Sequence, residues 1–374
     1  MQNSDKKSRL LHLDFMRGIF LCVIIVDHLQ KFPGFFELFT GRGLLWASAA
    51  EGFFFLSGIL LGLVRGRRSA SQPMLSVMKK LWGRATLLYI WNVLLTLLFT
   101  LIAFVFIDKV GLKPGYSTST SVSLIVQETL SLQYVYGWAD FLQYYAIFLF
   151  FSPVAIWLLR KKYWWLVLII SIGVWGLWGT RSHNFYLSWQ LLFFSGAVFG
   201  FYVEQIHAWF RGLQKITQKR VRNVVIAMAG LTFIASYIFV IGSIYIKDYP
   251  NWGWLSMLPA QKILDLNTWL SPGFDKPGLG VGRLITFYVW FFAMYFVIKR
   301  FAWLYEKTKV GRAITVLGQN SLYAYIVHSI LLFTVGLLWP GKYGIVLNIF
   351  INVGVISLIF VLVRKRVFFN YIPR

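Results

Sequence analysis

The sequence is poor in cysteine and in acidic residues, and both shortages limit what the protein can be. Its 374 residues include one cysteine, Cys22, so no intrachain disulfide can form and the redox compartment cannot be inferred. Asp and Glu together number 13, and charged residues make up 13% of the chain, whereas soluble domains have about 25%. Hydrophobic residues make up 58% and the mean hydropathy is +0.65, which excludes intrinsic disorder and indicates an integral membrane protein.

Short motifs of several enzyme classes are also missing. The five histidines show no HxxH or HExxH spacing and no CxxC accompanies them, so we expect no metal site. Walker A, GxSxG and HxxxxD motifs are absent as well. A net charge of +24 would suggest a nucleic-acid partner for a soluble protein. On so hydrophobic a chain it indicates basic loops facing an anionic cytoplasmic leaflet instead, and we expect no nucleic-acid partner.

Apolar runs of about 20 residues, the length that crosses a bilayer as a helix, recur through the whole chain. They predict a single all-α membrane domain over residues 1–374 with about ten transmembrane helices. The approximate limits are 15–31, 44–64, 82–107, 138–159, 163–179, 186–203, 222–246, 283–301, 314–338 and 345–363. The first run lacks a small-residue cleavage site after it, so we interpret it as a retained helix rather than a signal peptide.

The basic residues test this count independently. With a cytoplasmic N-terminus, 26 of the 37 basic residues fall on the cytoplasmic side, ten fall outside, and Arg17 lies inside the first span. This positive-inside pattern predicts both termini in the cytoplasm, with residues 1–14 and 367–374 as cytoplasmic segments. The outward connections 108–137 and 247–282 are too polar to span, and we expect them to cap an outward-facing cavity. The GxxxG pairs Gly58–Gly62 and Gly196–Gly200 predict helix packing.

Three titratable residues are predicted to reach one depth inside the membrane, where buried charge is costly and suggests function. At 1.5 Å per residue, His28 and His328 lie roughly 20 Å from the cytoplasmic face, and Glu51 lies about 20 Å from that face on a helix running inward. Each has a structural alternative, and for His28 it is a position near the outer interface with a hydrogen bond to Glu51 or to a backbone carbonyl. Glu51 is equally suited to be a hydrogen-bonding partner of a histidine or arginine, and His328 to be a polar contact between helices.

Arg17 and His28 share one face of the first span. They are eleven residues apart, which leaves about 20° between their directions and about 16 Å along the axis. Asp14 lies near the cytoplasmic end of this face, and Ser321 and His328 form a second one. A basic entrance leading to a deeper histidine would suit a phosphorylated donor entering from the cytoplasm. The alternative for Arg17 is a snorkelling or Asp14-paired structural arginine.

Three further residues lie at the outer ends of predicted spans and are either solvated or in contact with an acceptor. They are Arg181, His183 and Arg283.

Four stretches of the sequence together resemble the OpgC family. They are LDFMRGIFLCVIIVDH (13–28), AAEGFFFLSGILLG (49–62), SWQLLFFSGAVFG (188–200) and LGQNSLYAYIVHSILL (317–332). The first block also resembles the wider acyltransferase-3 group, which has an arginine and a histidine in its first helix. By matching position, Arg17 and His28 occupy the family's arginine and histidine positions and Glu51 its second-helix glutamate. Asp27 precedes His28 as in many relatives, whereas Trp189, Gln190 and His328 match positions without an assigned role.

The resemblance implies a bacterial inner-membrane enzyme. It would move an acyl group, of the succinyl or acetyl class, from a cytoplasmic acyl-CoA to a hydroxyl of an extracytoplasmic glycan. Its partners would be acyl-CoA as donor substrate, a carbohydrate acceptor and the lipid bilayer, with no permanently bound cofactor. Name-giving members of the family are associated with succinylation of osmoregulated periplasmic glucans. The sequence does not identify the acyl chain, the acceptor or the oligomeric state.

Our interpretation is therefore an O-acyltransferase in which His28 is the general base and Glu51, with Asp27 nearby, orients or polarises its imidazole. Arg17 would position the donor. Asn320, Ser321 or an arginine would stabilise the oxyanion, and an acyl-histidine intermediate stays open. The alternative function is a transporter or flippase that uses the same buried residues as a proton or substrate relay. A third possibility is an enzyme-like fold used only for glycan binding or export.

Overall fold

The computed structural model describes residues 2–29, 34–108, 113–182, 184–248, 259–339, 341 and 344–372, with side chains from residue 11 onward. In these ranges every regular element is a helix. Helices satisfy their own backbone hydrogen bonds, which the hydrocarbon core of a membrane requires. The expectation of an all-α membrane protein is confirmed.

The main helices of the membrane domain follow one another along the chain. They are α1 (Gln2–Leu29), α3 (Ala49–Leu60) with its π-helical continuation η2 (Leu61–Arg68), α4 (Met74–Val105), α6 (Asp140–Arg160), α7 (Trp164–Val174) with η4 (Trp175–Gly179), α9 (Phe185–Gly212), α10 (Lys215–Ser236) with η5 (Tyr237–Ile241) and α11 (Gly242–Asp248), α13 (Val281–Arg300), α15 (Lys309–Gln319), α16 (Ser321–Leu338) and α17 (Ile345–Arg364).

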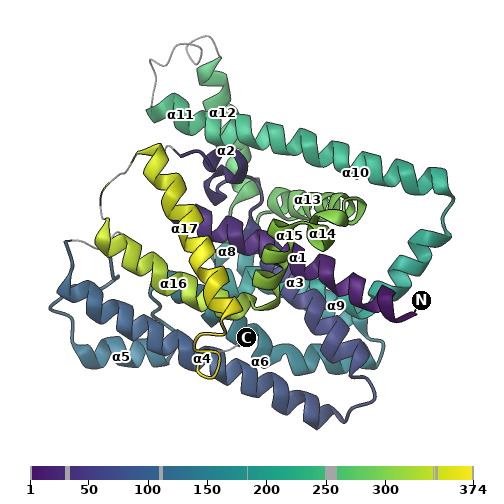
Figure 1. Cartoon of the computed structure of the whole chain (residues 1–374), viewed down its shortest axis with the longest axis horizontal. Helices are drawn as coiled ribbons and strands as arrows, with labels where there is room; N and C mark the ends of the chain where they lie inside the picture. The colour runs from purple at the N-terminus through teal and green to yellow at the C-terminus, as the bar shows by residue number, and fades with distance from the viewer. Residues whose placement is uncertain are drawn as a thin grey trace.

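Shorter helices occupy the connections between them. These are α2 (Glu37–Thr40), η1 (Gly41–Gly43), α5 (Val122–Leu130), η3 (Gly137–Ala139), α8 (Thr180–Ser182), α12 (Ala260–Leu270), η7 (Ser271–Phe274) and α14 (Trp303–Lys307). Figure 1 places α5, α11 and α12 at the end of the bundle opposite the N-terminus. The two long connections therefore lie on the same side, although α5 and α12 make them partly helical rather than simple loops.

Nine helical segments of the described residues are long and apolar enough to cross a membrane. The first helix, α1, is not one of them, because its apolar stretch contains Asp14, Arg17 and Asp27. It nevertheless lies inside the bundle, where it packs against α3, α15 and α16. The nine segments and α1 together account for the ten predicted stretches. Residues 2–14 continue the same helix and do not form a separate segment.

One predicted span, 314–338, is wrong as a single helix. The chain breaks at Asn320, whose backbone (φ −116°, ψ 34°) leaves the helical region, so α15 ends at Gln319 and α16 begins at Ser321. The Asn320 amide donates to the Val316 carbonyl at 3.0 Å and so satisfies an acceptor at the end of α15. His328 consequently belongs to α16 alone, two turns from the start of that helix.

The GxxxG pairs do pack helices, as predicted. An added Cβ at Gly58 or Gly62 on the α3–η2 helix would meet backbone atoms of α9, and one at Gly196 or Gly200 would meet backbone atoms of α3. Only glycine allows the two backbones to approach this closely. The crossing fixes α3, which carries Glu51, against α9, which carries Trp189.

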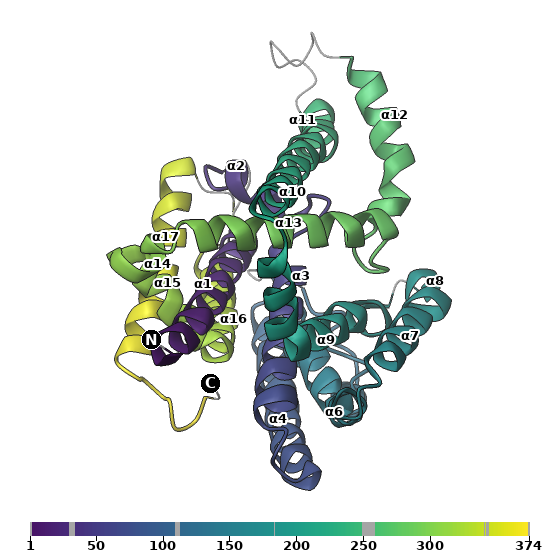
Figure 2. The ribbon, with the colours of Figure 1, turned by 90° about the vertical axis from the view of Figure 1, so that its right-hand side faces the viewer.

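The long helices do not all run in one direction. Helices α1, α4 and α10 run from side to side in Figure 1 and are foreshortened in Figure 2, which is turned by 90°. Helix α13 is seen lengthwise in Figure 2 and so crosses them. This crossing brings the N-terminal end of α13 toward α3, and the two helices are in contact.

Candidate active site

His28 and His328 meet at the centre of the candidate site. His28 lies in the last turn of α1, and its Nδ1 atom is 3.2 Å from Nε2 of His328 on α16. The two rings stack with their centroids 5.4 Å apart. His328 is completely buried, whereas His28 is an exposed residue at the end of α1. The predicted convergence of these two residues is therefore observed as a direct contact.

The hydrogen bonds assign a proton to each ring. Nδ1 of His328 lies 3.0 Å from the Tyr325 carbonyl oxygen, which can only accept, so this nitrogen must carry the proton. In the neutral ring Nε2 of His328 is then an acceptor, and Nδ1 of His28 donates to it. The Nε2 atom of His28 is left as the unprotonated nitrogen of its ring. That nitrogen can accept a proton from a substrate hydroxyl.

Glu51 does not orient His28, contrary to the sequence-based expectation. Its Oε1 atom accepts a hydrogen bond from Nε of Arg283, with which it forms an ion pair buried on both sides. Its Oε2 atom accepts from the backbone N–H of Ser48 at 3.0 Å and from the Ser48 hydroxyl at 2.5 Å. This is the capping box that begins α3, so local sequence draws the carboxylate toward the helix start.

Arg283 also departs from the expectation that it is solvated or near an acceptor. Only 2% of the residue is exposed, and Nη1 donates to the Leu45 carbonyl at 3.1 Å. The ion pair with Glu51 thus fastens α13, the start of α3 and the chain before α3 to one another. Taking one member from such a buried pair typically costs about 3–5 kcal/mol, which marks it as a structural element.

Lys276 lies near both the histidine pair and the ion pair of Glu51 and Arg283. It lies in the connection between η7 and α13, is half-buried, and donates from Nζ to the Gly43 carbonyl at 3.2 Å. Its charge interacts with His28, Asp27, Glu51 and Asp140, which come from three different helices. Asp27 is thus near this lysine, and in the described part of the chain its buried Oδ1 atom has no hydrogen-bond partner.

A second polar region lies toward the N-terminal end of α1. A cavity of about 220 Å³ is lined there by four cations, which are Arg17, Arg65, Lys80 and Arg84. Ser321 lines the same cavity, so the predicted faces of Arg17 and Ser321 do converge. Within the described residues the buried Nε atom of Arg17 has no hydrogen-bond partner. A guanidinium with an unused donor among further cations is suited to bind phosphate groups.

The other predicted binding residues take structural contacts. Asp14 interacts with Arg17 and with Gln319, and Asn320 closes the end of α15. Trp189 donates its indole N–H to the Lys276 carbonyl at 3.0 Å. Gln190 donates to the Ser171 carbonyl of α7 at 2.8 Å and so links two helices away from the histidines.

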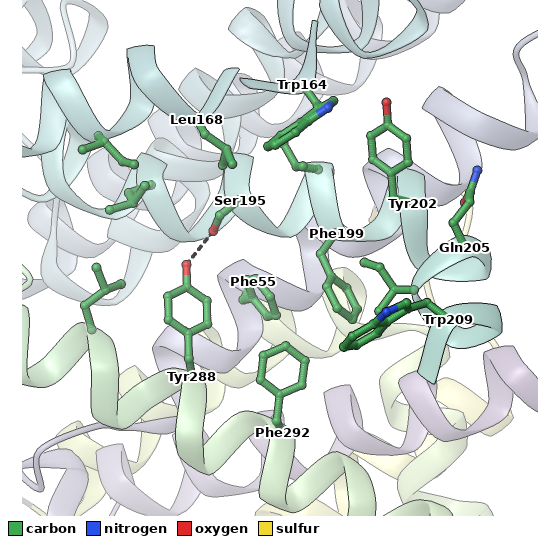
Figure 3. Close-up of a pocket in the computed structure, with 15 residues that line it drawn as sticks. Phe55, Trp164, Leu168, Ser195, Phe199, Tyr202, Gln205, Trp209, Tyr288 and Phe292 are labelled. Carbon is green, nitrogen blue, oxygen red and sulfur yellow. Dashed lines mark hydrogen bonds between the residues drawn. The ribbon is translucent and has the colours of Figure 1, made fainter. Parts of the chain in front are cut away.

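A separate, apolar groove of about 700 Å³ lies between α7, α9 and α13 (Figure 3). Trp164, Trp209 and Phe292 are among the side chains that line it. The hydroxyls of Ser195 and Tyr288 pair with each other at 2.7 Å across the groove, which leaves neither free to act alone. None of the described residues that line this groove is a histidine, a carboxylate or a cation, unlike those at the histidine pair and the cationic cavity.

Sequence reasoning did not identify Lys276, Lys80 or Arg84 as site residues. In the sequence, Lys80 and Arg84 indicate only a cytoplasmic loop, and Lys276 only an outward one. A weak signal existed for Lys276, which lies in the Pro- and Gly-rich stretch SPGFDKPGLG (271–280). Irregular backbone of this composition can be buried at membrane depth where protein surrounds it.

A comparison with protein-family models supports the resemblance found in the sequence. The model of the family described as OpgC protein matches residues 9–369, nearly the whole chain. The matched range includes both histidines, the cationic cavity and the Lys276 segment. No curated protein and no solved structure matches the chain in the corresponding comparisons.

Proposed function

Because the chain belongs to the OpgC family, we propose that it is an O-acyltransferase that moves an acyl group from a cytoplasmic acyl-CoA to a hydroxyl of an extracytoplasmic glycan. Family membership supports a membrane acyltransferase role in general. Our proposal adds four points to this role: the coenzyme A donor, the glycan acceptor, the succinyl or acetyl class of the acyl group, and the bacterial inner membrane as the location.

The observation that carries the proposal is the hydrogen-bonded pair of His28 and His328. The carbonyl of Tyr325 sets the tautomer of His328, and His328 sets that of His28, which leaves Nε2 of His28 as the free base. A hydroxyl is a weak nucleophile at neutral pH and requires such a base. His328 is in this scheme a positioning residue, because it contacts His28 and not the substrate.

The reaction proceeds by addition and elimination at the thioester. The acceptor oxygen forms a bond to the acyl carbon while its proton passes to Nε2 of His28, and the carbonyl oxygen takes the negative charge. Collapse of this tetrahedral intermediate breaks the carbon–sulfur bond. The proton on His28 then neutralises the departing coenzyme A thiolate, so the products are the ester and free coenzyme A and the enzyme returns to its starting state.

The cationic cavity is the proposed site for the donor phosphates. Arg17 and Arg84 lie deeper and Lys80 is exposed at the surface, so positive charge follows the path from the N-terminal side inward. Arg17 and His28 are about 16 Å apart along α1, a span that the extended arm of coenzyme A would bridge to bring the thioester to His28.

Purified protein incubated with several acyl-CoA donors, with and without glycan acceptors, tests the proposal. We expect coenzyme A release that depends on the acceptor and an ester on the recovered glycan. A failure to release coenzyme A from succinyl-, acetyl- or longer acyl-CoA in the presence of glucan and other periplasmic glycans would contradict it. Acceptor transport without coenzyme A release would favour the flippase alternative.

A further inference from the structure

The segment 271–280 enters the bundle and is fastened there by two tryptophans. Trp175 of η4 donates its indole N–H to the Leu279 carbonyl, and Trp189 of α9 donates to the Lys276 carbonyl, both at 3.0 Å. Leu279 is completely buried, and the ring of Phe274 stacks on Trp46 with centroids 4.2 Å apart. The backbone at Lys276 is therefore held from a neighbouring helix rather than left as an exposed loop.

The side chain of Lys276 is directed among the site residues. One of its three N–H groups is used by the Gly43 carbonyl. In the described residues it forms no ion pair, although its charge interacts with His28 and with the carboxylates of Asp27, Glu51 and Asp140. The ammonium thus keeps hydrogen-bonding capacity at a position close to the base.

The proposed reaction needs a group that stabilises the oxyanion, and the candidates named from the sequence are placed elsewhere. The Asn320 amide is bonded to Val316, and Ser321 lines the cationic cavity with Arg17. Arg283 is paired with Glu51. The Lys276 ammonium donates to the Gly43 carbonyl, and Gly43 lies beside the carboxylate of Asp27, the residue that precedes His28 on α1, so this cation lies near the proposed base.

We propose that Lys276 stabilises the oxyanion formed when the acceptor hydroxyl attacks the thioester beside His28. The inference rests on the proposed acyl transfer and adds a catalytic residue to it. Trp189 and Trp175 are positioning residues, since they hold the backbone that carries Lys276. The role explains why the ammonium of a lysine in an otherwise Pro- and Gly-rich connection is directed toward Gly43.

The titration of Lys276 gives the inference a signature in the pH profile. Burial lowers the pKa of Lys276; Glu51, Asp27 and Asp140 act against this, while Arg283 adds to it. A lysine loses its charge as the pH rises through its pKa, so Lys276 becomes neutral at a lower pH than an exposed lysine. Turnover should consequently fall on the alkaline side of the profile.

Lys276→Met tests the role, because methionine keeps a similar shape without the charge. We expect kcat to fall about 10²–10³-fold, the effect of removing one oxyanion donor. The KM for acyl-CoA should stay within about twofold, since the cationic cavity is unchanged. Lys262→Met, at an exposed lysine of the adjacent α12, is the matched control and should leave kcat unchanged.

Lys276→Arg provides a second measurement that does not require loss of charge. Arginine stays protonated at all accessible pH values, so the alkaline fall in kcat should move to higher pH. Suppose that the wild-type protein releases coenzyme A. An unchanged kcat in Lys276→Met, or an alkaline fall in kcat that does not move in Lys276→Arg, would then overturn the role of Lys276 and leave the proposed function standing. Absence of coenzyme A release from the wild-type protein would overturn the proposed function and the inference together.

Discussion

Nδ1 of His28 and Nε2 of His328 lie 3.2 Å apart, although the residues are separated by 300 positions in the chain. The contact joins the last turn of α1 to the interior of α16. Because the Tyr325 carbonyl fixes the proton on the far side of His328, the pair has one neutral arrangement, with the free nitrogen on His28. This single polarity makes the two histidines unequal, and it predicts different consequences for their replacement.

Replacing His28 should abolish transfer without affecting donor binding. In both His28→Ala and His28→Gln we expect kcat to fall about 10²–10⁴-fold, since glutamine can hydrogen-bond but cannot accept a proton at neutral pH. Wild-type turnover should also fall on acidification, when protonation of Nε2 removes the acceptor. Coenzyme A release, acyl-CoA binding and monodispersity in detergent measure these effects. Near-normal turnover by His28→Gln would eliminate the general-base role.

Replacing His328 should cause a smaller and partly recoverable loss. His328→Ala leaves Nδ1 of His28 without its acceptor, so we expect kcat to fall by up to about 10²-fold with the acyl-CoA KM unchanged. His328→Gln retains a carbonyl oxygen that can accept from His28 and should regain part of the activity. If alanine and glutamine variants were equally inactive, or if His328→Ala alone lost all transfer while His28→Ala did not, the assigned polarity of the pair would be wrong.

Arg17 should act through the donor. Arg17→Lys keeps the charge but loses the planar guanidinium that can bind a phosphate with two donors. Hydrogen bonds to charged groups contribute about 1.5–3 kcal/mol, so we expect the Kd for acyl-CoA to rise about tenfold or more. Arg181, an exposed arginine of α8, provides the control substitution to lysine. Unchanged donor affinity with reduced expression would instead identify Arg17 as a structural arginine.

The ion pair of Glu51 and Arg283 should stabilise the fold. Glu51→Gln leaves the Arg283 charge buried and unpaired, which should cost about 3–5 kcal/mol and lower the unfolding temperature in detergent. The double variant Glu51→Leu with Arg283→Met removes both charges and should recover much of the stability. A Glu51→Gln protein that unfolds like the wild type and yet lacks transfer activity would show that the carboxylate is needed for chemistry.

The membrane orientation is a prediction of loop charge and can be measured directly. Reporter fusions after residues 70, 162, 215 and 308 should report the cytoplasm, and fusions near 120 and 265 should report the outside. The two outside positions lie at or near α5 and in α12, which Figure 1 shows at the end opposite the N-terminus. Fusions at 120 and 215 that report the same side would refute the span count.

The sequence by itself determined the fold class and the limits of most helices, but not the break at Asn320. Apolar runs of membrane length define helices with little ambiguity, because a bilayer leaves few other ways to satisfy the backbone. Helical rise then gives the depth of a residue, and this placed His28 and His328 at one level. The packing at the GxxxG pairs can also be predicted from a short stretch of sequence, since a missing Cβ is enough to allow the close crossing of α3 and α9.

Only the tertiary structure decided which side chains meet. Depth along a helix does not specify which neighbour the helix faces, and this rotation depends on packing against every other helix. Glu51 lies at the same predicted depth as His28. Its carboxylate nevertheless accepts hydrogen bonds from Ser48, in the capping box of α3, and from Arg283 of α13. Lys276 lies in a connection outside the helices, so no helical periodicity indicates where its side chain lies. It reaches the site because Trp175 and Trp189 hold its backbone there, a contact that spans about a hundred residues of sequence.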